Sequence, residues 1–454
     1  MLLERAALYF DALGIAAPTS LIDRLGKARA LYAQLLRPDG TLPSLGNTVR
    51  IFEGGGIEGR VSARSNRGVA VERTVRWTGP TSGLLVWWSM DPTVPGDDRL
   101  SQTVVTWANF ATRAHKHVDE MSLFVWTNKS DILIGSGYWP YGSPYEKDAT
   151  GWAGANAPHF SSEAPEDRGE TRLLALASSD NFEFAELERT GRRGGRIQRQ
   201  ILHVRPDLWF VIDTPSSSEA DTLQSTWTFD PGLTVLPKSA DSLEIHSTTG
   251  LVAQVRFGEC RNGTWRLTKG SEAPFAGWTA ADGRIVPAPA VIRRCPAGES
   301  AVFILDTAQP GQRTSDVTLT RFVAPDDWTV SLGAEATAIA SRHASQIRSF
   351  LPRCRGDCEL VAITSVPSSD GAAEIDRSFR TLSEKYTRHQ EGWRRYRVKI
   401  SWALVIAWIG LLAVLAILGL VLRRNGLSLI SIVSATALAG WVGLALWLHL
   451  VYFQ

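Results

Sequence analysis

The chain has 454 residues and a formal net charge of +2, which excludes a strongly basic nucleic-acid-binding protein, so we expect no nucleic-acid partner. A hydrophobic content of 44% excludes a chain that is disordered throughout and allows a sizeable core. The 17 Trp against 3 Met are unusual and indicate that large, flat rings are used in the core or on a binding surface.

Two segments at the start of the chain have helical periodicity, residues 2–13 and 20–37. In the second, apolar residues recur at steps of three and four, and the turn Pro38-Asp39-Gly40 ends the helix. Two helices of this size cannot bury a core of their own. We therefore interpret residues 1–50 as the terminal helices and linker of a larger helical assembly.

From residue 51 to residue 367 the pattern changes to short alternating or β-branched runs, broken by Gly, Asn, Asp and Pro. Strand candidates recur at a spacing of about ten residues, which predicts a mainly β chain with a large antiparallel β-sandwich. Thr127-Asn128-Lys129-Ser130 predicts a hairpin turn. The strand candidates are residues 83–89, 121–126, 131–135, 197–204, 208–213, 223–229, 252–257, 301–305, 316–323 and 360–365.

The C-terminal region is predicted to enter a membrane. Residues 368–399 are polar and helical in pattern, and we expect an amphipathic stalk helix there. Two uncharged apolar runs follow, 400–422 and 427–453, and each exceeds the roughly 20 residues that span a bilayer core. Residues 400–453 are therefore predicted to form a transmembrane helical hairpin, with the membrane as a partner.

The four cysteines bear on the compartment of the large domain. Cys354 and Cys358 could close a small disulfide loop and Cys260 with Cys295 could form a second, with four unpaired thiols as the alternative. Basic residues before the first apolar run favour a cytoplasmic domain, whereas disulfides favour an extracytoplasmic, periplasmic one, which we prefer. The first residues lack a secretion signal, and we expect the start to be internal to a longer polypeptide.

The densest group of reactive side chains is Arg113-Ala114-His115-Lys116-His117-Val118-Asp119, at the entry to the predicted strand at 121–126. On an extended chain, His115, His117 and Asp119 alternate and point to one face. Two imidazoles and a carboxylate on one face can bind a metal or perform acid–base chemistry. The alternative is an exposed polar strand edge.

Two further groups have simpler interpretations. The basic segment Arg192 to Arg199 is either a solvated turn or a contact for an acidic glycan. His203 and His246 lie singly on predicted strands, and we interpret them as structural residues.

The order of motifs resembles a known family. The run HKHVDEMSLFVWTNKSDILIGSGYWPYG, followed by GANAPHFSSE, resembles the β-sandwich half of the heparinase II/III-like polysaccharide lyases. Residues 1–47 resemble the last helices of the family's (α/α) toroid and their linker, and three later segments resemble the following strands: RQILHVRPDLWFVIDT, STWTFDPGLTV and GWTAADGRIVPAPAVIRR. The resemblance covers residues 1–310 and implies a toroid packed on a β-sandwich, cleaving uronate-containing acidic polysaccharides by β-elimination.

The resemblance also implies roles for single residues. The elimination needs neutralisation of the uronate carboxylate, a base for the C5 proton and an acid for the leaving O4. His115 would neutralise the carboxylate or assist proton transfer, and Tyr141 is the second catalytic candidate. The implied substrate-binding residues are Arg113, Lys116, Tyr138, Trp139 and Trp152. His117 and His159 match ligand positions of a structural zinc, with Asp119 as a substitute for a missing ligand.

The chain departs from the family pattern in several places. The zinc-ligating aspartate falls in the stretch Ile134 to Gly137, which has no carboxylate; the usual acidic residue after the linker is Asn47, and an expected asparagine is Phe160. The toroid's catalytic residues would lie upstream of Met1. We therefore expect that no cofactor is required and keep two hypotheses. One is a membrane-anchored lyase-like protein completed by an upstream toroid domain; the other is a non-catalytic glycan-binding or polysaccharide assembly or export subunit of the bacterial envelope.

Overall fold

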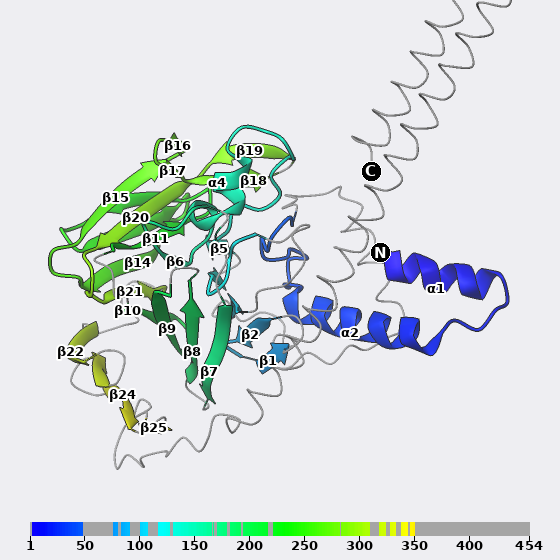
Figure 1. Cartoon of the computed structure of the whole chain (residues 1–454), viewed down its shortest axis with the longest axis horizontal. Coiled ribbons are helices and arrows are strands. Elements are labelled where there is room, and N and C mark those ends of the chain that lie inside the picture. Colours follow the sequence, from blue (N-terminus) through cyan, green and yellow to red (C-terminus); the bar gives the residue numbers. More distant parts are fainter. Residues whose placement is uncertain are drawn as a thin grey trace, which may run out of the picture. The chain divides into compact units, whose positions relative to one another are not determined.

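The computed structural model describes the part of the chain drawn in colour in Figure 1. The described residues are 2–48, 76–79, 83–90, 100–107, 117–127, 130–165, 167, 170–178, 182–191, 194–216, 221–281, 283–308, 317–323, 327–332, 337–343 and 346–349. The chain divides into two units, Met1–Arg380 and Thr381–Gln454. The predicted strand at 360–365, the stalk helix and the membrane hairpin lie outside the described residues. Among the residues described, no helix is long and apolar enough to cross a membrane.

The two predicted N-terminal helices are confirmed as α1, Leu2–Ala12, and α2, Thr19–Leu35 (Figure 1). Helix α2 ends where Leu36 becomes extended, with φ −69° and ψ 121°. The last carbonyl groups of a helix have no partner within it, and two of them, on Gln34 and Leu35, accept hydrogen bonds from Gln102 Nε2 at 3.0 Å each. The C-terminus of α2 is thereby joined to the first sheet.

The first sheet has five antiparallel strands in the order β1-β2-β3-β4-β5. Strands β4 and β5 pair from Thr127 opposite Ser130, so the predicted hairpin is confirmed. Strand β2 is buried at every position and follows the expectation for 83–89. The strands are β1 Arg76–Gly79, β2 Leu84–Trp88, β3 Ser101–Thr106, β4 Leu123–Thr127 and β5 Ser130–Leu133.

The second sheet has eight antiparallel strands in the order β12-β13-β14-β21-β10-β9-β8-β7. Its pattern follows from the period of two along a strand: on β13, Leu243 and Ile245 are buried while the residues between and beside them are partly exposed. The strands are β7 Glu170–Ser178, β8 Phe182–Thr190, β9 Arg196–Val204, β10 Leu208–Ser216, β12 Thr234–Pro237, β13 Ser242–Ser247, β14 Gly250–Glu259 and β21 Ala301–Asp306.

A four-stranded sheet in the order β15-β20-β11-β6 packs against this one. Trp227 of β11 stacks on Phe303 of β21, with ring centroids 3.9 Å apart, inside the main apolar core. Two antiparallel sheets that share a core form a sandwich, as predicted. The strands are β6 Pro158–Phe160, β11 Leu223–Thr228, β15 Thr264–Lys269 and β20 Pro289–Cys295.

Shorter elements complete the described fold. They are two short helices, two two-stranded antiparallel sheets (β16-β17 and β18-β19) and a four-stranded antiparallel sheet in the order β22-β23-β24-β25. These elements are α4 Glu146–Thr150, the 3₁₀ helix η1 Trp152–Gly154, β16 Ser271–Glu272, β17 Phe275–Ala276, β18 Trp278–Ala281, β19 Arg284–Pro287, β22 Val317–Val323, β23 Asp327–Leu332, β24 Thr337–His343 and β25 Gln346–Ser349.

A buried polar centre lies inside the sandwich. Arg199 forms a bidentate pair with Asp213 at 2.6 and 2.7 Å and donates to the carbonyl groups of Met121 and Asn156 at 2.8 and 2.6 Å. A buried charge requires such partners. The suggestion that Arg199 is part of a solvated or glycan-binding basic segment is therefore wrong; Arg192 and Arg193 lie outside the described residues.

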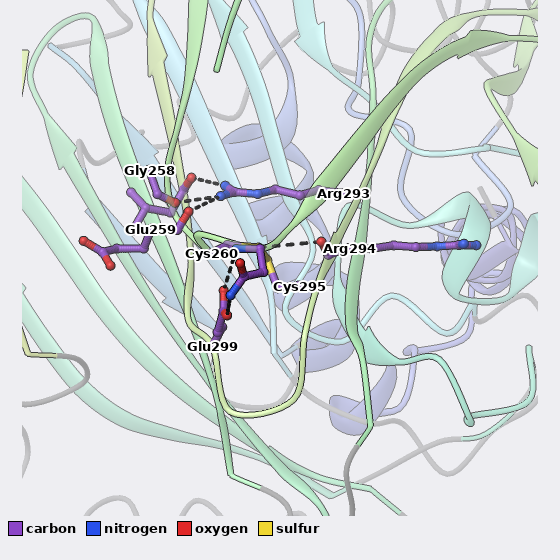
Figure 2. Close-up of a disulfide and its surroundings, with 9 residues drawn as sticks. Gly258, Glu259, Cys260, Arg293, Arg294, Cys295 and Glu299 are labelled. Atoms are coloured by element: carbon purple, nitrogen blue, oxygen red, sulfur yellow. Dashed lines mark hydrogen bonds between the residues drawn. A yellow bond between two sulfur atoms is a disulfide. The ribbon is translucent and has the colours of Figure 1, made fainter. Parts of the chain in front are cut away.

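One predicted disulfide is confirmed. Cys260, after β14, is bonded to Cys295 at the end of β20, across 35 positions of sequence (Figure 2). Arg293 of β20 donates hydrogen bonds to the carbonyl groups of Gly258 and Glu259 beside it. The bond therefore joins one strand from each sheet of the sandwich. Cys354 and Cys358 lie outside the described residues.

Candidate functional site

The structure describes the second half of the histidine motif. Arg113, His115 and Lys116 lie outside the described residues. His117 and Asp119 lie in a loop before β4, where Ser122 N donates to Asp119 O at 3.0 Å and Met121 has a left-handed backbone with φ 69°. His117 and Asp119 therefore lie in a loop and not on a strand, and the chain turns between Asp119 and Ser122 before β4 begins.

The linker after α2 lies against the segment that follows β5. Gly135 N donates to Ser44 Oγ at 3.1 Å, and Tyr138 N donates to Thr48 O at 3.1 Å. Added Cβ atoms at the glycines would lie 3.0 Å from Ser44 O at Gly135 and 3.2 Å from Thr48 O at Gly137, which also has φ 66°. Glycine is needed at both positions because the linker backbone approaches so closely.

His117 lies where this linker and the loop before β4 meet. Its Nε2 is 2.8 Å from Asn47 Oδ1, and its Nδ1 is 3.3 Å from Ser136 Oγ. Asn47 Nδ2 donates to the hydroxyl oxygen of Tyr141 at 2.9 Å, and Tyr138 packs edge-on against Tyr141 at 6.4 Å. We call these five residues the Asn47 cluster.

The Asn47 cluster leads from the interior to the surface. His117 is 5% exposed, Tyr138 is half-buried and Tyr141 is 61% exposed. Three chain segments contribute to it: the linker, the loop before β4 and the segment after β5. A phenol that is exposed but held by a hydrogen bond to a buried network can meet a polymer in a fixed orientation and exchange a proton with it.

Two aromatic residues expected to contact a sugar are instead part of the core. Trp139 is 5% exposed, packs edge-on against Phe275 at 5.6 Å and donates from Nε1 to Pro144 O. Trp152 is 2% exposed and stacks on His159 at 5.8 Å, with the Arg189 guanidinium 4.3 Å from its ring centre. The burial of both rings contradicts a stacking role for them, because neither presents a face to a sugar.

The described residues do not fit the implied zinc site. His159 is buried, and its ring stacks on Trp152. His117 has both ring nitrogens in hydrogen bonds, and Asp119 is buried in the loop turn. Among the described residues, no group of three or more His, Cys, Asp or Glu side chains could hold a metal ion.

The sequence points to His117, Tyr138 and Tyr141 but not to the connection between them. Asn47, and the stretch Ile134 to Gly137 that contains Ser136, stand only as departures from the family pattern. Asn47 and Ser136 lie 70 and 19 positions from His117 in the sequence, so no periodicity links them to it. The one feature of the sequence that points to Asn47 and Ser136 is that neutral hydrogen-bonding residues occur where the family pattern has acidic ones.

Among the comparisons with known proteins, the one with solved structures identifies the fold. No protein-family model matches the sequence, and no curated protein matches it. Among solved structures, the heparinase III that is the BT4657 gene product has a TM-score of 0.56 at 13% identity, over 71% of this chain and 52% of that one. Heparan sulfate lyase HepC from Pedobacter heparinus has a TM-score of 0.56 at 10% identity, over 76% of this chain and 53% of that one.

A further heparinase III structure has a TM-score of 0.53 at 11% identity, over 77% of this chain and 55% of that one. The chain therefore spans about half the length of the structures it resembles. At such low identity the likeness establishes the fold, which is that of the β-sandwich part of heparinase III.

Proposed function

We propose that this is a membrane-anchored, polysaccharide lyase-like protein that acts on uronate-containing acidic glycans by β-elimination. The observation that carries the proposal is the Asn47 cluster, which holds an exposed tyrosine beside the histidine motif on a heparinase III-like sandwich. One structural neighbour is a heparan sulfate lyase, so heparan sulfate is the first polymer to test.

The proposed chemistry divides between the described and the undescribed side chains. Tyr141 is exposed and would transfer a proton at the reacting carbon or the leaving oxygen. Tyr138, packed edge-on against it, would wall the sugar cleft. His115 would neutralise the uronate carboxylate or assist proton transfer, and Arg113 and Lys116 would add positive potential for a polyanion. We propose that no cofactor is required.

The remaining catalytic groups would come from a helical toroid. The hairpin of α1 and α2 has an apolar surface, and exposed apolar clusters are typical of surfaces that bury against a partner. An upstream toroid domain would cover it, and an in-frame toroid in the coding sequence before Met1 would support this. A coding sequence without one would contradict it. The large exposed side chains are Leu8, Tyr9, Leu13, Ile15 and Ile22.

Residues 400–453 are proposed to anchor the protein in the membrane as a helical hairpin, with the first unit on the extracytoplasmic, periplasmic side. The two uncharged runs support the anchor. The Cys260–Cys295 bond supports the compartment, because disulfides persist in oxidising environments.

The proposal is tested with the full-length protein, including any upstream domain, on a panel of uronic-acid polysaccharides that begins with heparan sulfate. β-Elimination leaves an unsaturated uronate that absorbs ultraviolet light. We expect Tyr141→Phe to lower kcat/KM by about 100-fold or more, because it removes a proton-transferring hydroxyl. Tyr145→Phe is the matched control, since Tyr145 lies in the same loop region but bonds Glu272 instead.

Two results would overturn parts of the proposal. Equal loss of activity in both tyrosine variants would remove Tyr141 from the reaction. Binding of a polysaccharide with no unsaturated product would favour the second function, a non-catalytic glycan-binding or polysaccharide assembly or export subunit of the envelope.

A further inference from the structure

We infer that His117 is the centre of a metal-independent hydrogen-bond clasp, which replaces the structural zinc implied by the family resemblance. The clasp consists of Asn47, His117, Ser136 and the carbonyl group of Ala149. The inference concerns the architecture of the site and holds whether or not the protein cleaves a polysaccharide.

Nδ1 of His117 lies 3.3 Å from the Ser136 hydroxyl oxygen. Ser136 has one hydroxyl proton, and it donates that proton to Ala149 O at 2.6 Å. The hydroxyl that lies beside Nδ1 is therefore held in place by α4.

Nε2 of His117 lies 2.8 Å from Asn47 Oδ1, an amide oxygen that can only accept, so Nε2 carries a proton and has no lone pair for a metal. Nδ2 of the same amide donates to the Tyr141 hydroxyl at 2.9 Å. A zinc ion bonded to Nε2 would lie about 2.0–2.1 Å from it and would have to displace this amide. Displacement would also release Tyr141, so the contacts of Asn47 and a metal at His117 exclude each other.

The two side chains that contact His117 are both neutral. The family's aspartate falls in the stretch that here contains Ser136, and the usual acidic residue of the linker is here Asn47. Both partners of His117 are therefore neutral where the pattern expects acids. Zinc sites rely on anionic or neutral lone-pair donors arranged around the ion, whereas a serine and an asparagine complete hydrogen bonds to an imidazole.

His159 does not supply the missing ligand. Its ring is stacked on Trp152. The Arg189 guanidinium also lies over Trp152, paired with Glu163 at 2.6 and 2.7 Å.

The clasp performs the joining that a structural metal would perform. It connects the linker, the loop before β4 and α4 through Asn47, His117 and Ala149. Ser136 is fixed at its backbone as well, since its N–H donates to Gly154 O at 3.1 Å and its carbonyl accepts from Ala280 N at 2.8 Å. The clasp therefore rests on a rigid segment, and its outer end positions Tyr141.

The test measures the zinc content of the full-length protein as purified, and its thermal unfolding before and after dialysis against EDTA. We expect no stoichiometric zinc in the purified protein, and the same Tm before dialysis, after dialysis and with added Zn²⁺. Ser136→Ala, which removes the hydroxyl that bonds Ala149 O and lies beside Nδ1 but leaves the imidazole, should lower Tm by about 2–8 °C, and added Zn²⁺ should not restore it. The double variant Asn47→Asp, Ser136→Asp places two carboxylates beside His117 and should gain Zn²⁺-dependent stabilisation.

A wild-type protein that retains stoichiometric zinc and loses stability in EDTA would overturn the inference. So would a Ser136→Ala variant with unchanged Tm, since the clasp would then carry no stability. These two outcomes are measured on the wild type and on a single variant, so they test the inference even if the double variant does not fold. None of them measures lyase activity, so failure of the clasp is distinguished from failure of the proposed function.

Discussion

Several ionisable residues buried in this sandwich are paired or neutral. Arg199 is paired with Asp213, and Arg189 with Glu163, each by two hydrogen bonds. His203 is treated differently: it stacks on Trp209 with ring centroids 4.4 Å apart, and its Nε2 lies 3.3 Å from Pro206 O. His203 is fully buried, and loss of water around it favours the uncharged imidazole.

The uncharged state of buried His203 predicts how the free energy of unfolding depends on pH. Burial lowers its pKa to about 3 in the folded protein, opposed in part by the Pro206 carbonyl, whereas the unfolded chain has the ordinary value of 6.5. Below pH 6.5 the unfolded state binds a proton that the folded state does not. His203 therefore lowers the free energy of unfolding as the pH falls from 6.5 towards 3, by about 1.4 kcal/mol per pH unit.

Denaturant unfolding of the wild type and His203→Gln over this range measures the effect. Glutamine retains a donor for Pro206 O but does not titrate. The difference in unfolding free energy between the two proteins should change with pH below 6.5 and be constant above it. A pH-independent difference would show that His203 is not held neutral.

Among the secondary-structure elements, α2 decides where the Asn47 cluster lies. Arg37, just after α2, pairs with Asp131 of β5 at 2.8 Å, bonds Gln102 of β3 at 3.0 Å and lies over the Trp126 ring at 5.9 Å. These contacts fix the start of the linker that carries Asn47 to His117.

Breaking this pair should destabilise the protein strongly. Asp131→Asn leaves the buried Arg37 charge uncompensated, and we expect a loss of about 3–5 kcal/mol in the free energy of unfolding. Asp23→Asn removes the partner of Lys27 in an exposed pair on α2, with side chains 59% and 75% exposed, and should cost under about 0.5 kcal/mol. Similar losses in both variants, measured by denaturant unfolding, would contradict the assignment of α2 docking to Arg37.

The elements were largely predictable from sequence, because hydrophobic periodicity and turn residues act locally. The β4–β5 hairpin follows from alternation around Thr127 to Ser130, and the Cys260–Cys295 bond is one of the pairings that the sequence predicts. The site was less predictable. Aromatic residues such as Trp152 have the same sequence pattern in a core as in a sugar cleft. The contacts of His117 depend on tertiary packing of distant segments, which no local rule contains.

At the scale of the whole molecule, the oxidation state of the cysteines tests the proposed compartment. If the first unit lies outside the cytoplasm, Cys260 and Cys295 are oxidised in the cell as they are in the structure. Protein extracted in the presence of an alkylating reagent should then show both cysteines unmodified in peptide maps until a reductant is added. Alkylation without reduction would contradict the extracytoplasmic proposal.

The sandwich shares its fold with heparinase III, and the chain spans about half the length of those structures. The described residues of this chain include an exposed Tyr141 at the end of a buried hydrogen-bond network. The central proposal is that this tyrosine belongs to an eliminating enzyme, and elimination differs from hydrolysis in what happens to water.

Mass spectrometry of the products formed by the full-length protein from a uronate-containing polysaccharide in heavy-oxygen water tests this most directly. β-Elimination breaks the bond to O4 without adding water, so we expect unsaturated uronate ends and no solvent oxygen in the new ends. Products with saturated ends that carry solvent oxygen would show hydrolysis and contradict the account.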